Sequence, residues 1–137
     1  MSGETTRPTP VAKPLGRRQA RRQALFLLYQ WDLTGQQLAS LYEGDVDPFA
    51  RRLAEEVAAR APELDVRITA AARGWTAERL GVVERNILRI AIHELDRGEV
   101  PLEVAIDEAV RLAKRYASAD AASLVNGILA SIAREAA

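Results

Sequence analysis

The chain has 137 residues, of which 48% are hydrophobic and 28% charged, values that are ordinary for one soluble globular domain. It contains one histidine and no cysteine, which excludes a disulfide framework and leaves too few ligands for a structural zinc site. No apolar run approaches the roughly 20 residues that a membrane span needs, and the N-terminus lacks the apolar stretch of a secretory signal, so we expect a cytoplasmic protein.

The formal net charge is zero, but the charges are unevenly distributed along the chain. Residues 1–22 hold six basic groups against one acid, whereas the remainder holds 13 basic and 18 acidic residues. This asymmetry predicts a basic N-terminal arm on a mildly acidic body. A nucleic-acid partner would explain the arm, and a solubilising tail is the alternative.

The first predicted elements are a tail and a helix. Residues 1–16 contain three prolines and almost nothing apolar, which predicts a disordered basic tail. Helical periodicity begins at Arg17 and continues to about Thr34, where Gly35 ends the run. A short helix is expected around residues 36–42.

Two separate helices are expected in the next segment. Asp47 followed by Pro48 predicts an N-cap and a first helical residue, for a helix that ends near Ala61. Pro62 then predicts the start of a second helix, which ends before Gly74.

Three further helices are expected after a short turn or helix at residues 75–81. Apolar residues recur at helical spacing over about 82–97, from Pro101 to Tyr116, and again over 124–132. No convincing two-residue alternation appears anywhere in the sequence. The pattern therefore predicts an all-α bundle of six or seven helices.

The inventory of residues does not favour an enzyme, a metal site or a bound cofactor. There is no phosphate-binding loop, and the single histidine, His93, lies beside apolar residues on a predicted helix, which is typical of a packed side chain. Acidic residues cluster at Asp107 and Glu108, but basic residues follow on the same helix. Balance of Asp107 by Arg111 and of Glu108 by Arg115 predicts a solvated face.

Four arginines, Arg17, Arg18, Arg21 and Arg22, occupy the first turns of the helix predicted to start at residue 17. Cations at this end oppose the helix dipole, and the pairs four residues apart repel each other. Their presence is therefore not explained by helix stability. Guanidinium groups beside exposed N-terminal amides suit phosphate groups, so this cluster predicts contact with nucleic acid.

Three other residues are candidates on geometry alone. Tyr29 falls within roughly 40° of Arg18 and Arg22 on a helical wheel. Its phenol could stack on a base or donate to a protein partner, and a position bordering the core is the alternative. Asp120 is placed to cap the last helix, and Gly127 inside that helix predicts close packing by a neighbour.

Four sequence blocks, in the same order, resemble the NusB family. They are Arg17-Arg18-Gln19-Ala20-Arg21 with Leu28-Tyr29-Gln30-Trp31, Val83-Glu84-Arg85-Asn86-Ile87 with Glu94-Leu95, Val100-Pro101 through Ala113-Lys114, and Asp120 with Leu124-Val125-Asn126-Gly127. Each block alone is weak evidence, but together they span about 120 residues in register. The resemblance covers the chain from Arg17 almost to its end.

The resemblance implies a helical RNA-binding domain of two small subdomains over residues 17–137. It implies a transcription antitermination factor that binds, as single-stranded RNA, the boxA element of nascent ribosomal RNA leader transcripts. The implied partner is NusE, a small-subunit ribosomal protein, in a larger complex with other Nus factors and RNA polymerase.

The resemblance also assigns roles to individual positions. The positions that correspond to RNA-binding residues of the family are Arg17, Arg18, Arg21 and Asp120. Arg22 is added for its charge alone, because many relatives have an acid there. Tyr29 and Glu84 are expected to face NusE, the tyrosine by hydrogen bonding and the glutamate by pairing with a basic side chain. Leu124 departs from the family, where this position is often aromatic, so no stacking on RNA is expected from it.

Three alternatives remain open. The chain could be a helical protein-interaction module without RNA specificity, and a flat response of RNA binding to salt would indicate this. It could be a NusB-like accessory domain of an rRNA methyltransferase system, although the sequence has no glycine-rich cofactor segment. Dimers occur among relatives, so a homodimer that buries the arginine surface is an alternative storage form.

Overall fold

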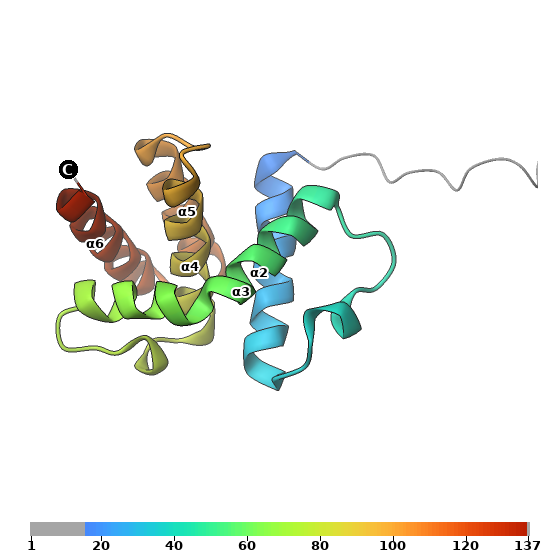
Figure 1. The fold of residues 1–137 in the computed structure, drawn as a ribbon. Coiled ribbons are helices and arrows are strands. Elements are labelled where there is room, and N and C mark those ends of the chain that lie inside the picture. The colour runs from blue at the N-terminus through green and yellow to red at the C-terminus, as the bar shows by residue number, and fades with distance from the viewer. Residues whose placement is uncertain (1–15, 137) are drawn as a thin grey trace, which may run out of the picture.

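The computed structural model describes residues 16–136, and every regular element in that range is helical (Figure 1). The elements are α2 (Arg17–Thr34), the 3-10 helix η1 (Leu38–Leu41), α3 (Pro48–Ala71), the 3-10 helix η2 (Ala77–Arg79), α4 (Val82–Arg97), α5 (Leu102–Tyr116) and α6 (Ala119–Ala136). The predicted disordered tail, residues 1–16, lies outside the described residues apart from Gly16, the N-cap of α2. None of the described helices is long and apolar enough to cross a membrane.

The all-α prediction is confirmed, but the predicted helix count is not matched. The described residues form five α-helices and two short 3-10 helices. The 3-10 helices lie where a short helix was expected around residues 36–42 and a short turn or helix at residues 75–81. Helix α2 has the predicted bounds, and Gly35 ends it in the left-handed conformation, with φ of 74°. A glycine adopts this conformation without steric cost, which is why the sequence signal was reliable here.

Helix α3 overturns the expected break at Pro62. It runs through Pro62 as one element, and Figure 1 shows that it bends part-way along. A proline inside a helix removes one backbone donor and typically bends the helix. Leu64 and Ile68, beyond the proline, are fully buried in the core. Burial of these side chains offsets the lost hydrogen bond, because each contributes roughly 1.5–3 kcal/mol.

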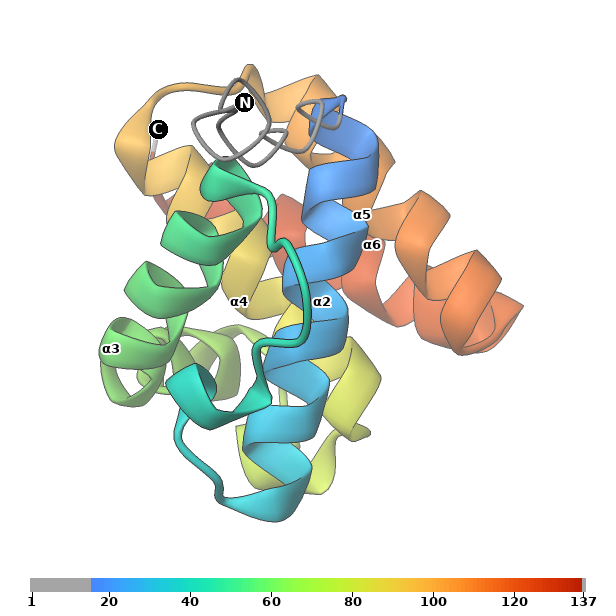
Figure 2. The same cartoon turned by 90° about the vertical axis from the view of Figure 1, so that its right-hand side faces the viewer.

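Helix α4 is the centre of the fold, because α2, α3, α5 and α6 all pack against it. In Figure 1, α6 lies on one side of α4 and α2 lies on the other, and Figure 2 shows α2 in front of α4. Every residue from Asn86 to Glu94 is buried, including the four polar ones. The central helix therefore supplies polar partners to its neighbours as well as apolar core.

A partly buried ionic network joins α2, α3 and α4. Asp32 Oδ2 on α2 accepts hydrogen bonds from Arg85 Nε at 2.9 Å, Asn86 Nδ2 at 3.0 Å and Arg89 Nη1 at 2.9 Å. Arg89 also donates to both carboxylate oxygens of Asp65 on α3, at 2.8 and 2.6 Å. Burial acts to raise the pKa of Asp32, but these hydrogen bonds and the arginine charges outweigh it and hold the pKa below its ordinary value. The network is therefore charged at neutral pH and fixes α2 to the helices behind it.

Candidate nucleic-acid interface

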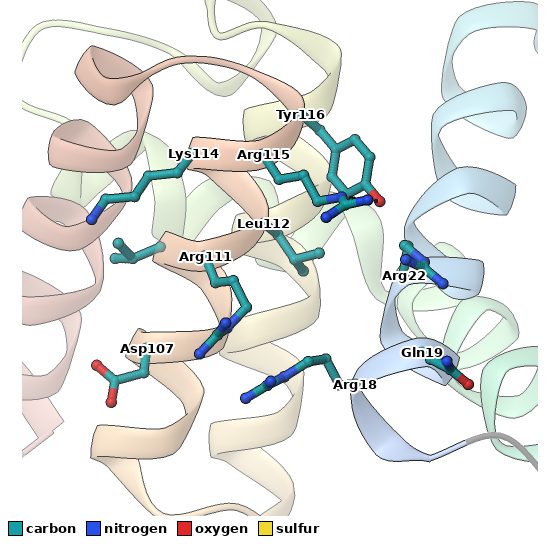
Figure 3. Close-up of a pocket in the computed structure, with 10 residues that line it drawn as sticks. Arg18, Gln19, Arg22, Asp107, Arg111, Leu112, Lys114, Arg115 and Tyr116 are labelled. Carbon is teal, nitrogen blue, oxygen red and sulfur yellow. Dashed lines mark hydrogen bonds between the residues drawn. The ribbon is translucent and has the colours of Figure 1, made fainter.

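A groove of about 800 Å³ lies between the first turns of α2 and helix α5 (Figure 3). Its charged lining residues are Arg18 and Arg22 from α2 and Asp107, Arg111, Lys114 and Arg115 from α5. Five cations and one carboxylate are thus among its lining residues. We call this feature the cationic groove. Its charge suits the phosphate groups of a nucleic acid.

Two side-chain contacts join the helices on either side of the cationic groove. Arg18 of α2 forms an ion pair with Glu108 of α5 at 3.0 Å. Phe26 of α2 meets Tyr116 of α5 edge to face, with the ring centroids 5.2 Å apart. Arg115 Nε donates to the Tyr116 hydroxyl at 3.0 Å, so a cation and an aromatic ring lie together at this end of the groove. Figure 3 shows Arg18 reaching toward α5, whereas Lys114 points away from α2.

The four predicted arginines are not brought together. Arg18 and Arg22 line the cationic groove. The guanidinium of Arg17 lies over the ring of Phe49 on α3, 3.9 Å from its centroid, so this exposed residue faces a different neighbour. A cation held on an aromatic face keeps its charge available to solvent and to an anion. Arg17 and Arg18 are therefore the two exposed cations in the first turn of α2, whereas Arg22 is half-buried.

Arg21 is buried, with 8% of its surface exposed. Its Nε donates to both carboxylate oxygens of Glu94 on α4, at 2.8 and 3.0 Å, and Glu94 is buried as well. This pair fixes the first turns of α2 to the central helix. The placement argues against the expected contact between Arg21 and RNA, because its guanidinium has an internal partner.

The basic side chains of α5 were missed as site residues by sequence reasoning. Balance of Glu108 by Arg115 was expected along one helix, but Glu108 pairs with Arg18 on α2 and lies 4.0 Å from Arg111. The face that was predicted to be merely solvated is therefore one wall of the cationic groove. The sequence signal for this wall is a run of basic residues near the C-terminal end of a helix. Such a run is equally typical of residues that stabilise the helix dipole.

Comparison with known proteins places this arrangement in a family. The family model described as the NusB family matches residues 18–134. The chain belongs to the NusB family. It is 38% identical to the transcription antitermination protein NusB of Solibacter usitatus, over 87% of this chain and 89% of that protein. It is 39% identical to the NusB of Rubrobacter xylanophilus, over 84% of this chain and 88% of that protein.

Solved NusB structures share the fold. T. maritima NusB superposes with a TM-score of 0.79 at 32% identity, covering 90% of this chain and 94% of that one. A crystal structure of the antitermination factors NusB and NusE in complex with dsRNA matches with a TM-score of 0.76 at 30% identity, covering 87% of this chain and 96% of that one. The sequence resemblance to the NusB family is thereby confirmed.

The two residues expected to face NusE lie on neighbouring helices of this chain. Tyr29 is 36% exposed on α2, in a stripe with the exposed Phe26 and Leu33. Because these residues are three and four positions apart, they share one helix face. Glu84 lies in the first turn of α4, where its carboxylate folds back against Gly81. Tyr29 is therefore available to a partner, whereas Glu84 is only partly exposed.

Two expectations for the last helix are wrong. Ser118 caps α6, since its Oγ accepts a hydrogen bond from the Ala121 amide at 3.0 Å, so Asp120 is not the cap. Asp120 is exposed in the first turn, where the helix dipole favours an acid, and it is not among the described residues that line the cationic groove. A Cβ placed at Gly127 would meet no atom within 4 Å, so close packing does not explain this glycine.

His93 is a packed side chain, as predicted. Its Nδ1 lies 2.7 Å from Arg60 Nη1 and its Nε2 lies 2.8 Å from Glu56 Oε1. Because arginine can only donate, Nδ1 accepts a hydrogen bond and Nε2 donates to the glutamate. Within residues 16–136, no group of three or more acidic or histidine side chains is arranged to hold a metal ion.

Proposed function

We propose that this chain is a transcription antitermination factor that binds the boxA element of nascent ribosomal RNA leader transcripts through the cationic groove, together with NusE. The observation that carries the proposal is the convergence of Arg18 and Arg22 with Arg111 and Arg115 on one groove. The relatives' shared name, transcription antitermination protein, supports the process. The related structure of NusB and NusE with RNA supports both partners.

The groove offers RNA two kinds of contact. Its arginines can pair with phosphates, which supply most of the affinity of proteins for nucleic acids. Tyr116, held by Phe26 and Arg115, offers an aromatic face to a base. Stacking of this kind requires an unpaired base and favours the single-stranded boxA over a duplex. Because the related complex contains dsRNA, the test includes a duplex.

A titration with RNA at several salt concentrations tests the RNA partner. We expect a short boxA RNA to bind with log K falling against log[salt] at a slope of roughly −2 to −3, since about three or four phosphate contacts each contribute about 0.7. A scrambled strand and a duplex of the same length should bind more weakly. A flat salt response would instead indicate a protein-interaction module without RNA specificity.

We further propose that Tyr29 and Glu84 contact NusE. Substitution of Tyr29 by Asp, or of Glu84 by Arg, is expected to weaken NusE binding roughly tenfold or more, because each removes a contact and adds an unpaired charge. Isothermal titration with purified NusE measures the effect. Leu102→Asp is the matched control, because Leu102 is 39% exposed, similar to Tyr29, and lies on α5. Loss of boxA binding alongside NusE binding, in a folded variant, would contradict two separate surfaces.

The wider assignment follows from the same family. Residues 17–137 would form the RNA-binding domain, organised as two small helical subdomains, with residues 1–16 as a basic tail. The protein would act in the cytoplasm, without catalysis, in a complex with other Nus factors and RNA polymerase. Asp120 would lie beside the bound RNA, and a homodimer that buries Arg17, Arg18 and Arg22 would be a storage form. Analytical ultracentrifugation with and without RNA tests the dimer.

A further inference from the structure

An acidic residue lies between two cations of the cationic groove. The side chain of Glu108 on α5 is only 12% exposed, and it contacts arginines that line a groove proposed to bind phosphate. Its Oε1 accepts hydrogen bonds from Arg18 Nε at 3.2 Å and from Arg18 Nη2 at 3.0 Å. Arg111 Nε is 4.0 Å from the same oxygen. One carboxylate thus contacts cations from both walls.

If the groove served only to attract a polyanion, the carboxylate of Glu108 among its arginines would have no purpose. A negative charge among the groove arginines lowers the affinity for every phosphate chain, because it cancels part of the field that attracts them. Stabilisation of the fold by the ion pair between Glu108 and Arg18 does not explain the carboxylate either. The Arg18 side chain is 61% exposed, and ion pairs with an exposed partner contribute little stability.

The geometry does explain a role in orientation. Arginine carries five N–H groups in a planar fork, and Glu108 engages two of them from one side. The fork is thereby fixed in one plane, with the remaining N–H groups available to a ligand. A long side chain that is already ordered loses less entropy when it binds, so the gain is greatest for a ligand that needs this one orientation.

We propose that Glu108 is a positioning residue that raises selectivity for the cognate RNA. It holds Arg18 in the orientation that this RNA requires and lowers the attraction of the groove for other polyanions. The inference rests on the proposed function, because it requires a preferred RNA. The negative charge of Glu108 would weaken binding of all polyanions, while its contact with Arg18 would favour the cognate RNA.

The test compares Glu108→Gln with Asp107→Asn. Both variants remove one negative charge beside the groove arginines. Only Glu108 forms an ion pair with Arg18, whereas Asp107 is an exposed lining residue. Affinities for boxA RNA and for a scrambled strand of equal length are measured at 0.1 M salt. Asp107→Asn should raise the affinities for the two RNAs by a similar factor. The factor is at most about fivefold, because one added phosphate contact releases about 0.7 of a counterion.

Glu108→Gln should raise the affinity for the scrambled strand in the same way but reduce the ratio of boxA to scrambled affinity by about 2- to 10-fold. Arg18→Lys is the second variant, because it keeps the charge of an exposed residue and removes the fork, so the ratio should also fall. If the ratio of boxA to scrambled affinity is unchanged in Glu108→Gln, or falls equally in Asp107→Asn, the role of Glu108 is wrong and the proposed function still stands. A wild-type chain that binds both RNAs equally would overturn the proposed function with it.

Discussion

Replacement of Arg21 by alanine should lower the free energy of unfolding by about 3–5 kcal/mol, because it leaves the charge of Glu94 buried without its partner. Both side chains are more than nine-tenths buried, and two hydrogen bonds join them. Urea unfolding followed by circular dichroism measures the loss. The effect on RNA binding should follow only from loss of the folded protein.

Two comparisons isolate the buried pair. Arg22→Ala alters a neighbour that lines the groove, and it should change stability by about 0.5 kcal/mol or less. A double variant, Arg21→Met with Glu94→Leu, replaces the whole pair by apolar side chains and should recover most of the stability, since buried pairs are often neutral against such replacements. If Arg21→Ala unfolds at the same urea concentration as Arg22→Ala, the pair does not hold α2.

Reversal of charge on the α5 wall should reduce the affinity for boxA RNA about 100-fold at 0.1 M salt. The variant Arg111→Glu with Arg115→Glu removes about two phosphate contacts of about 0.7 counterion each and adds repulsion. The salt slope should shrink by at least about 1.4. Fluorescence anisotropy with labelled RNA measures both quantities, and binding of NusE should be unchanged.

The control for this reversal carries the same change in net charge. Arg79 lies in η2 and Arg134 in the last turn of α6, and neither lines the cationic groove. Arg79→Glu with Arg134→Glu should therefore lower the RNA affinity only slightly, through the long-range field. An equal loss in the control and in the α5 variant would mean that RNA responds to total charge and not to this groove.

The helices could be predicted wherever a local signal agreed with the packing. Gly35 and Gly98 end α2 and α4 in the left-handed conformation. The end of α2 was predicted from Gly35, and the end of α4 was predicted near residue 97 from the apolar spacing. Pro62 was misread, because proline favours a first helical turn but is also tolerated inside a helix whose far side is anchored. The anchors, Leu64 and Ile68, bury against other helices, so their effect is absent from the local pattern.

The site residues, like the helices, could be predicted only where a local pattern in the sequence placed them. Arg21 precedes the buried Ala24, Leu25 and Leu28 by three, four and seven positions, so the helical period already placed it on the inner face. That signal could have separated it from Arg18. The pairing of Arg18 with Glu108 could not be read in this way, because the two residues are 90 positions apart and meet only after folding. Charge balance within α5 was the simpler interpretation of the sequence alone.

The two walls of the groove differ in their tolerance of change. The α2 wall shares its helix with Arg21 and Asp32, both tied to the central helix, so an alteration there risks disturbing the interior. Arg111, Lys114 and Arg115 on the opposite wall are exposed, and substitution of their outer atoms leaves the interior intact. Divergence in ligand preference can therefore accumulate on α5 at little expense in stability, and a laboratory library that aims to retarget the protein should randomise that wall first.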